Sequence, residues 1–331
     1  MIRVAIDAMG GDNAPAAEVA GAALALVELA DVTLLMVGRE EAIVPELERR
    51  PDLDRGRVEI VEAPEVVTME DKPLQAVRQK RKSSLVIGIG LHAEGRADAF
   101  LSAGNTGAVL AASTVLLGLH PGVDRATVAS VLPTAEGPML LLDAGANVDC
   151  SARELVNFAH LGSVYMRDMV GREAPTVGLL NIGEENDKGS AVVREAHQAL
   201  RQDGRLNYVG NIEGRDIVVP HPRHGHIDVV VTDGFTGNVV LKFYESMGRL
   251  VDALLRRDSP DLIGDQRLDP LRRFLDYSEY GGAPLLGVKG VPIICHGSST
   301  PVAIKNAIHK AVESVQAGLN QHIAEEFAEQ A

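Results

Sequence analysis

Residues 98–109 read DAFLSAGNTGAV, and residues 228–239, which lie 130 positions later, read DVVVTDGFTGNV. Both fit the pattern D-x-x-x-[ST]-x-G-x-T-G-x-V, in which an apolar run ends at a hydroxyl residue, passes through glycine and enters a helical stretch. A helix that begins directly after a strand presents unpaired backbone N–H groups and the positive end of its dipole, which suits an anion. Two ordinary tight turns are the alternative, because Gly and Thr are common there. The repetition favours a pair of phosphate-binding cradles.

Outside these two segments, the chain alternates short β-branched runs with longer helical patterns. Several of the runs are apolar on both faces, as strands covered by helices on both sides must be. The alternation predicts an α/β fold built as a three-layer α/β/α sandwich. The predicted strands are residues 3–7, 32–38, 58–62, 97–102, 127–132, 139–143, 176–182, 206–210 and 227–232.

Three of the predicted helices have defined ends. The first runs over residues 15–29, with Asn13 as its N-cap and Pro15 in its first turn. A long helix is predicted over residues 238–257, and a last one over residues 301–329. No Ser- or Gly-rich linker separates these segments. We therefore expect residues 1–331 to form a single two-lobed domain without a clean internal boundary.

The composition limits the classes of protein to which this chain can belong. The 331 residues include 32 Lys and Arg against 46 Asp and Glu, a formal net charge of −14, and 46% are hydrophobic. A sizeable core is expected and general disorder is not. The acidic balance argues against nucleic-acid binding, which needs a basic surface to displace counterions. Two cysteines cannot form a disulfide framework, and neither a signal segment nor a membrane-spanning apolar run is visible. A cytoplasmic protein is expected.

Three further polar turns follow predicted strands. They read DAMGGDNAP (7–15), DAGAN (143–147) and NIGEENDKG (181–189). Open α/β sheets bind ligands at the carboxyl ends of their strands. Lys188 is the only cation in these turns, so it is a candidate partner for a phosphate or a developing oxyanion. A surface ion pair with its acidic neighbours is the alternative.

Two motifs suggest other functions. The segment GIGLHA (88–93) matches the G-x-G-x-x-A of dinucleotide sites, but it reads as part of a continuous helix, and that fingerprint must follow a strand. The segment HPRHGH (221–226) holds three histidines. Metal sites need further ligands and a defined support, so we favour a solvated loop over a zinc or iron site. We expect neither a metal nor a nicotinamide cofactor.

Cys295 and His296 are adjacent and could form a nucleophile with its base. Neighbouring residues on a strand point to opposite faces, however, which makes direct pairing awkward. His296 precedes a Gly-Ser-Ser turn and is a candidate acid or hydrogen-bond donor. A structural, hydrogen-bonded histidine is the alternative.

Six motifs occur in order across essentially the whole chain. They are DAMGGDNAP (7–15), SAGNTG (102–107), DAGAN (143–147), NIGEE (181–185), DGFTGN (233–238) and YSEYGGAPLLG (277–287). Together they resemble the PlsX family, the phosphate acyltransferases of bacterial phospholipid synthesis. The resemblance implies a fold similar to phosphotransacetylase and to the isocitrate and isopropylmalate dehydrogenases. The loop 221–226 and the polar stretch 259–271 depart from the family pattern.

The resemblance implies transfer of a long-chain fatty acyl group from acyl carrier protein to inorganic phosphate, giving acyl phosphate for phosphatidic acid synthesis. It also implies a homodimer that associates peripherally with the membrane. There a membrane acyl-phosphate:glycerol-3-phosphate acyltransferase would take the product. No metal or organic cofactor is expected. A phosphotransacetylase-like enzyme acting on acyl coenzyme A is the alternative.

With phosphate as the nucleophile, the reaction needs positioned donors more than a nucleophilic side chain. We expect Lys188 to neutralise charge on phosphate or on the tetrahedral oxyanion, and Asn238 to donate to the thioester carbonyl. His296 would protonate the leaving thiolate. The residues expected to hold phosphate are Gly104, Asn105, Thr106 and Gly107 in one cradle and Gly234, Thr236 and Gly237 in the other.

Acyl carrier protein is strongly acidic, as is this chain, so a local basic patch must attract it. The densest basic cluster, and our candidate docking site, is Arg78, Lys80, Arg81 and Lys82. Residues 256–257 with 272–273 form the second candidate. A solvated helix face is the alternative for either cluster. Apolar residues between 254 and 275 predict a tip that touches lipid, with core packing as the alternative.

Overall fold

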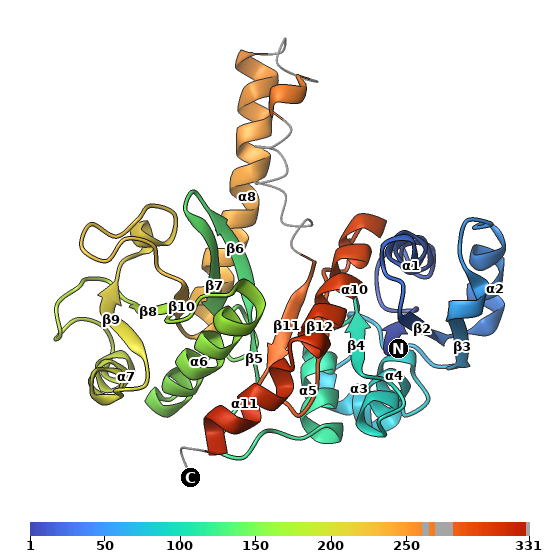
Figure 1. The fold of residues 1–331 in the computed structure, drawn as a ribbon, viewed down its shortest axis with the longest axis horizontal. Helices are drawn as coiled ribbons and strands as arrows, with labels where there is room; N and C mark the ends of the chain where they lie inside the picture. Colours follow the sequence, from blue (N-terminus) through green and yellow to red (C-terminus); the bar gives the residue numbers. More distant parts are fainter. Residues whose placement is uncertain (260–264, 269–280, 329–331) are drawn as a thin grey trace. The chain divides into compact units, whose positions relative to one another are not determined.

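The computed structural model describes residues 1–259, 265–268 and 281–328. Its tertiary contacts divide the chain into two compact units (Figure 1). Unit 1 combines both ends of the chain, Met1–Val128 and Gly281–Ala331, and unit 2 is the continuous segment Ala129–Tyr280. That the two units work as one catalytic domain without an internal boundary stays a prediction.

Unit 1 is built on a mainly parallel sheet with the strand order β3-β2-β1-β4-β12-β11-β5. In this sheet β11 runs antiparallel to both of its neighbours, β12 and β5, and the other described pairs are parallel. The strands are β1 (Ile2–Asp7), β2 (Val32–Gly38), β3 (Val58–Glu62), β4 (Ala99–Ser102), β5 (Thr127–Val128), β11 (Ala283–Leu286) and β12 (Pro292–Ile294).

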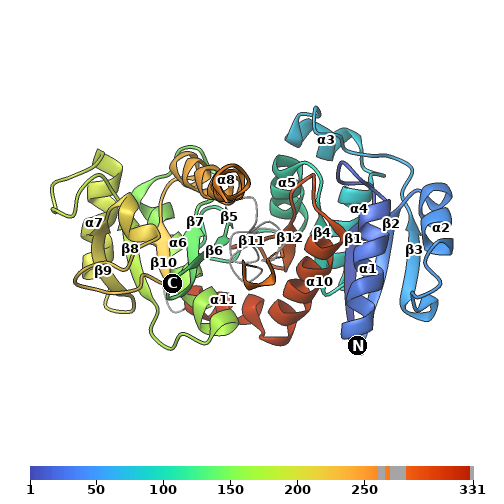
Figure 2. The same ribbon diagram turned by 90° about the horizontal axis from the view of Figure 1, so that it is seen from above.

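Helices cover both faces of this sheet (Figure 2). They are α1 (Ala16–Glu28), α2 (Glu40–Glu48), α10 (Pro301–Gln316) and α11 (Leu319–Ala328), and α3 (Pro73–Gln79), α4 (Ser84–Ala93) and α5 (Thr106–Leu116). α1 packs against α10, whereas α5 packs against α3 and α4. Figure 2 shows α10 and α5 on opposite sides of β4 and β12. Unit 1 is therefore the predicted three-layer α/β/α sandwich.

Alternating side chains of β4 pack against the helix layers on the two faces of the sheet. Ala99 and Leu101 belong to the core cluster formed with α1 and α10. Phe100 points the other way, because a Cβ added to Gly88 of α4 would lie 2.5 Å from its ring. Gly88 thus lets α4 approach the sheet. The segment 88–93 is helical, as predicted, and its glycines are not a dinucleotide loop.

Unit 2 has a second sheet with the order β6-β7-β10-β8-β9. β6 and β7 form an antiparallel hairpin, and the other pairs are parallel. Its strands are β6 (Ser130–Thr134), β7 (Gly137–Leu142), β8 (Thr176–Leu180), β9 (Asn207–Ile212) and β10 (Val229–Val231). Its helices are α6 (Ala152–Tyr165), α7 (Ala191–Gln202) and α8 (Gly234–Asp258). α6 packs on β7, β10 and β8 and against α7, and α8 contacts β7.

Several predicted elements differ from the structure. The predicted strand 127–132 is broken at Ala129, so that Thr127–Val128 pairs with β11 and Ser130–Thr134 with β7. The predicted last helix is divided at Gly318, whose φ of +69° is left-handed and cannot continue an α-helix.

Two further differences concern helix starts and short strands. Pro15, rather than Asn13, occupies the N-cap of α1, and no side chain caps this end. β11 and β12 were not predicted, because strands of four and three residues carry little periodicity.

The aspartate of each repeated motif ties two neighbouring strands together at their amino ends. Asp228 Oδ2 accepts from the Thr176 N–H over 2.8 Å, and the Asp228 N–H donates to the Thr176 carbonyl over 3.1 Å. Asp98 makes the same pair of bonds with Arg3, over 2.7 Å each. Both carboxylates also pair with an arginine, Arg172 at 3.1 Å and Arg3 at 3.6 Å.

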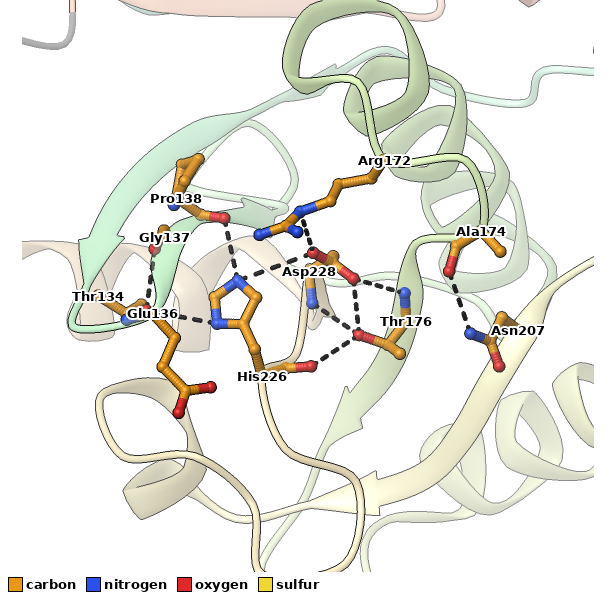
Figure 3. Close-up of polar contacts among 10 residues, drawn as sticks. All are labelled: Thr134, Glu136, Gly137, Pro138, Arg172, Ala174, Thr176, Asn207, His226 and Asp228. Carbon is orange, nitrogen blue, oxygen red and sulfur yellow. Dashed lines mark hydrogen bonds and ion pairs between the residues drawn. The ribbon is translucent and has the colours of Figure 1, made fainter.

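The two copies differ in burial and in the number of contacts. Asp228 is 10% exposed at its side chain and also accepts from Thr176 Oγ1 over 2.9 Å, beside His226 (Figure 3). Asp98 is 33% exposed. The repeated aspartates are thus structural, and they lie at the strand ends opposite to the glycine turns.

The carboxyl group of Glu18 is buried without full hydrogen bonding. Glu18 on α1 is 2% exposed, and within the described chain its Oε2 has no hydrogen-bond partner. Burial raises the pKa of Glu18 to about 8, and the nearby Asp7 adds to the increase. Glu18 is therefore protonated in the folded protein at neutral pH.

Replacing Asp228 should cost more stability than replacing Asp98. Asp228→Ala leaves the partly buried Thr176 N–H without its acceptor and the Arg172 guanidinium without its ion-pair partner, so we expect a loss of about 2–4 kcal/mol in the free energy of unfolding. Asp98→Ala is the matched control and should cost about 1 kcal/mol, because water replaces the lost contacts. Urea denaturation followed by circular dichroism measures both. Equal losses would contradict the burial argument.

Glu18→Gln should stabilise the protein in a pH-dependent way. The folded state holds the proton up to about pH 8, whereas the unfolded chain loses it near pH 4.5. The wild type therefore loses stability relative to the variant as pH rises between these values, and the difference levels off above pH 8. Urea denaturation from pH 5 to pH 8 measures this slope. Exposed Glu48 provides the control, and a Glu18→Gln difference that is independent of pH would refute the raised pKa.

Candidate functional site

The start of α5 offers three consecutive backbone donors. Asn105 is the N-cap, and its Oδ1 accepts from the Ala108 N–H over 3.0 Å. The N–H groups of Asn105, Thr106 and Gly107 donate no hydrogen bond within the described chain. Because these donors lie at the positive end of a helix dipole, they suit a phosphate or another small anion.

The Asn105 side chain holds this turn in place. Its Nδ2 lies within hydrogen-bond distance of three carbonyl oxygens in the loop before α3, those of Thr68 (3.1 Å), Met69 (3.4 Å) and Asp71 (3.2 Å). The amide is therefore fully used by the protein. Only the backbone N–H of Asn105 remains for a ligand in this conformation.

Loops from three strands meet beside this turn. Ser102 Oγ accepts from the Gly104 N–H over 3.0 Å and donates to Asp7 Oδ2 over 2.8 Å. A Cβ on Gly10 would lie 2.9 Å from the Gly104 nitrogen, so the backbones are in close contact. The Asp12 N–H donates to the Gly297 carbonyl over 2.8 Å. The carboxyl ends of β1, β4 and β12 thus form one edge, as expected for a ligand site in a parallel sheet.

Burial raises the pKa of the titratable groups under this edge. Burial raises the pKa of Asp7, although hydrogen bonds from Ser84 and Ser102 oppose the increase. Burial also raises the pKa of the Cys295 thiol, and Glu18 adds to it. A thiol with a raised pKa is a poor nucleophile, because the thiolate is the reactive form. This argues against an acyl-cysteine intermediate at Cys295.

His296 lies on the exposed side of the same loop. Its Nδ1 accepts from the Ser298 N–H over 3.2 Å and lies 2.8 Å from Ser298 Oγ. A ring nitrogen that accepts a backbone hydrogen bond carries no proton, so the neutral imidazole holds its proton on Nε2. Nε2 is then the atom that could donate to a substrate.

The start of α8 in unit 2 uses the same motif differently. Asp233 is the N-cap, and its carboxylate accepts from the Thr236 N–H and from Thr236 Oγ1, each over 2.8 Å. The Gly234 N–H donates to the Asn147 carbonyl over 2.8 Å, and the Gly237 N–H to the Asp233 carbonyl over 2.9 Å. The backbone donors of Gly234, Thr236 and Gly237 are thus engaged, and a carboxylate occupies the position that suits an anion.

The glycines of this second turn are required by packing. A Cβ on Gly237 would lie 1.9 Å from the Asp143 carbonyl oxygen, and one on Gly234 would lie 2.5 Å from the Asn147 carbonyl oxygen. Asp143 in turn accepts from the N–H groups of Gly145, Ala146 and Asn147. The loop 143–147 is therefore fixed against the first turn of α8.

Asn238 lies on the exposed side of this contact. A Cβ on Gly145 would lie 3.3 Å from that of Asn238. The amide of Asn238 is open to a ligand.

Lys188 lies in the loop after β8 and is exposed. The loop itself is tied down by hydrogen bonds from the Asn181 amide to the Lys188 carbonyl, over 3.2 Å, and from the Asn211 amide to the Glu185 carbonyl, over 3.0 Å. Within the described chain the Lys188 ammonium forms no ion pair, although acidic residues surround it in sequence. Lys188 and Asn238 belong to unit 2, whereas His296 belongs to unit 1.

The predicted docking cluster is only partly available. Lys80 Nζ donates to the Val66 carbonyl over 2.9 Å and to Asp71 Oδ2 over 2.5 Å, so its charge is used internally. Arg78, Arg81 and Lys82 are exposed.

In the second basic cluster, Arg256 and Arg257 each pair with an aspartate over 2.6 Å. Arg272 and Arg273 lie outside the described residues.

The three-histidine loop is more ordered than predicted. His221 is buried, and its Nδ1 accepts from the backbone N–H groups of Arg223 and His224. His226 lies against Asp228 and the Pro138 carbonyl (Figure 3). The expectation of a solvated loop is therefore wrong for His221. In the part of the chain that the structure describes, no group of three or more His, Cys, Asp or Glu side chains is arranged to hold a metal ion.

Sequence reasoning missed the contacts that support the α5 turn. Ser102 and Asp7 were recognised only as motif members, and Glu18 was not singled out. Their positions at strand ends and in the first helix were visible signals, but their burial depends on long-range packing.

Comparisons with known proteins agree along the whole chain. A family model described as "Fatty acid synthesis protein" matches residues 2–322. A phosphate acyltransferase from Desulforamulus reducens is 47% identical over 98% of this chain and 97% of its own. A phosphate acyltransferase from Heliobacterium modesticaldum is 46% identical over 97% of this chain and 98% of its own.

Solved structures with a similar fold include two phosphotransacetylases. The EutD phosphotransacetylase from Staphylococcus aureus has a TM-score of 0.63 at 17% identity, covering 96% of this chain and 94% of its own. A phosphotransacetylase from Streptococcus pyogenes has a TM-score of 0.63 at 18% identity, with the same coverage. These likenesses confirm the predicted α/β/α fold. Together with the family model and the full-length relatives, they lead to one assignment: the chain belongs to the PlsX family of phosphate acyltransferases.

Proposed function

We propose that this chain transfers a long-chain fatty acyl group from acyl carrier protein to inorganic phosphate. The products are acyl phosphate, for phosphatidic acid synthesis, and free carrier protein. The observation that carries the proposal is the α5 turn, where Asn105, Thr106 and Gly107 direct three unengaged N–H groups from a helix start. The relatives named phosphate acyltransferase support phosphate as the acceptor.

Each candidate residue has a role that its chemistry allows. In this proposal the N–H groups of the α5 turn hold phosphate, which attacks the thioester carbon. Lys188 neutralises charge on phosphate or on the tetrahedral oxyanion, and Asn238 donates to the carbonyl oxygen. His296 gives the proton on Nε2 to the departing thiolate. The thioester C–S bond breaks as the new C–O bond forms, and no covalent enzyme intermediate is needed.

The start of α8 has a lesser part in this proposal than the sequence suggested. Gly234 and Gly237 are needed where backbones meet, and the Asp233 carboxylate caps the helix. We therefore assign phosphate binding chiefly to the backbone N–H groups of Asn105, Thr106 and Gly107, while Gly104, whose N–H donates to Ser102 Oγ, shapes the turn. Thr236 supports its own turn through Asp233.

The proposal also includes assembly and location. A row of large apolar side chains on α8 is exposed and supports a homodimer through this helix. The row consists of Phe235, Val239, Phe243, Leu250 and Leu254. Among the described helices, none is long and apolar enough to cross a membrane.

We propose a cytoplasmic enzyme with peripheral membrane association, which supplies a membrane acyl-phosphate:glycerol-3-phosphate acyltransferase. Of the segment 254–275, predicted to touch lipid, residues 260–264 and 269–275 lie outside the described residues.

A phosphotransacetylase-like activity on acyl coenzyme A is the second candidate, favoured by the folds of the structural neighbours. Both activities would use the same phosphate cradle. They differ in the donor, which is either a protein-bound or a free pantetheine thioester.

Phosphate-dependent turnover of palmitoyl-acyl carrier protein tests the proposal. We expect free carrier protein to appear, as measured by mass spectrometry, only when inorganic phosphate is present. Turnover of acetyl coenzyme A should be much slower at the same concentration. Faster turnover of acetyl or palmitoyl coenzyme A than of the carrier-protein thioester would favour the second candidate. Release of carrier protein without phosphate would refute both.

Lys188→Ala should lower turnover strongly while preserving the fold. A cation that meets a phosphate or oxyanion in a partly dry site contributes about 3–4 kcal/mol to the transition state, or on the order of a hundredfold or more in rate. Steady-state kinetics and a melting curve measure the two effects. Lys242→Ala is the control, because this lysine forms only an exposed pair with Glu245. A folded Lys188→Ala protein that keeps more than about a third of the wild-type turnover, a barrier change under about 1 kcal/mol, would exclude the role.

A further inference from the structure

A groove of about 570 Å³ lies between α3, α4 and α5 of unit 1. Its lining is mostly apolar and comes largely from α4 (Val86, Ile87, Leu91) and α5 (Val115, Leu116). Val115 is 64% exposed and Leu116 is 38% exposed, so the apolar wall is open to solvent. Exposed apolar surface next to charged residues is typical of an interaction site.

Arginines line the two ends of this groove. Arg78 and Arg81 precede α4 and line one part of it, and within the described chain their guanidinium groups form no ion pair. Arg96 follows α4, and its only described pairing is with Glu94 at 3.6 Å, where both side chains are 64% exposed. Such an exposed pair is weak. The positive charges thus bracket α4, whose ten residues span about 15 Å.

We propose that this groove, the α3–α4–α5 groove, docks an acidic amphipathic helix of the acyl carrier protein. Apolar side chains of that helix enter the groove, and its carboxylates pair with Arg78 and Arg81 at one end and with Arg96 at the other. The proposal rests on the proposed function, because it names the surface that receives the acyl donor.

The distance between the arginines favours a helix over a single lipid chain as the ligand of this groove. A fatty acyl group with a single anionic head needs cations at one end of an apolar groove only. Cations at both ends of the ten-residue helix α4 can pair with a partner helix that carries several carboxylates along its length. An amphipathic helix also presents its apolar residues at three- and four-residue intervals along one face, which suits the apolar groove. The chain as a whole carries a net charge of −14, so the local arginines must overcome general repulsion.

The structure also limits which basic residues take part. Lys80 is bound to Asp71 and to the Val66 carbonyl, so it stabilises the loop beside the groove instead of binding a partner. Arg96 was not part of the basic cluster that the sequence indicated. Arg96 follows α4 in the chain, whereas Arg78 and Arg81 precede it, and all three line the groove.

Gly90 provides a way to fill the groove without changing charge. It lies on α4 and lines the groove, and a Cβ added there meets nothing within 4 Å. Gly90→Leu therefore places an isobutyl group in the space proposed for the partner's side chains. Gly204→Leu is the matched control, because Gly204 is also open but lies in unit 2.

The test is steady-state kinetics with two donors, palmitoyl-acyl carrier protein and palmitoyl-pantetheine. We expect Gly90→Leu and the double variant Arg78→Glu/Arg81→Glu each to raise KM for the carrier-protein donor at least about tenfold, with kcat and the KM for phosphate within about twofold of wild type. The double variant should also weaken the salt dependence of that KM. Gly204→Leu and Arg39→Glu/Arg55→Glu should behave as wild type.

The outcomes separate this proposal from the proposed function. The proposed function would be refuted if the wild type showed no phosphate-dependent turnover of palmitoyl-acyl carrier protein. Normal wild-type turnover with an unchanged carrier-protein KM in both folded groove variants would refute the docking groove alone. If Gly90→Leu impairs both donors equally, the groove holds the acyl chain and the docking proposal is wrong. Should Gly90→Leu fail to fold, the double arginine variant decides the question by itself.

Discussion

The hydrogen bond from Ser102 Oγ to Asp7 Oδ2 joins the ends of two neighbouring strands, β1 and β4. Both residues are buried, so water does not compete for this contact. The same hydroxyl accepts from the Gly104 N–H and thereby fixes where the chain turns into α5. A shift of either strand end would move the N–H groups of Asn105, Thr106 and Gly107. The geometry of the proposed phosphate site thus depends on one buried pair.

The comparison of the two repeated motifs explains what sequence could predict. Runs rich in β-branched and apolar residues predicted the strands 32–38 and 58–62 with their observed bounds. The shared glycines predicted two strand-to-helix turns, and both are present in the structure. The pattern could not show that α8 begins at Gly234, two positions earlier in the motif than α5. Asp233 can cap a helix with its side chain, and Ala103, at the same motif position, cannot.

The residues that sequence reasoning missed share a physical cause. Glu18, the α3–α4–α5 groove and the short strands β11 and β12 are defined by packing between distant segments. Local composition says little about such contacts. The roles of Lys188, Asn238 and His296 were inferred from chemistry and from a family resemblance, and they stay predictions. What the structure adds is the surroundings of each, such as a lysine ammonium that forms no ion pair with the described residues and an imidazole whose Nδ1 accepts from the Ser298 N–H.

The division of unit 1 between the two ends of the chain has a consequence for its synthesis. A ribosome releases residues 129–280 before β12 and α10 exist, so unit 2 can pack while unit 1 still lacks an inner strand and much of one helix layer. Until then one edge of β4 has no neighbouring strand, because β12 pairs with it. The contact between Asp12 and Gly297 closes only after the C-terminal segment emerges. The α5 turn can therefore form early, whereas the edge beside it gains its last supporting loop only late in synthesis.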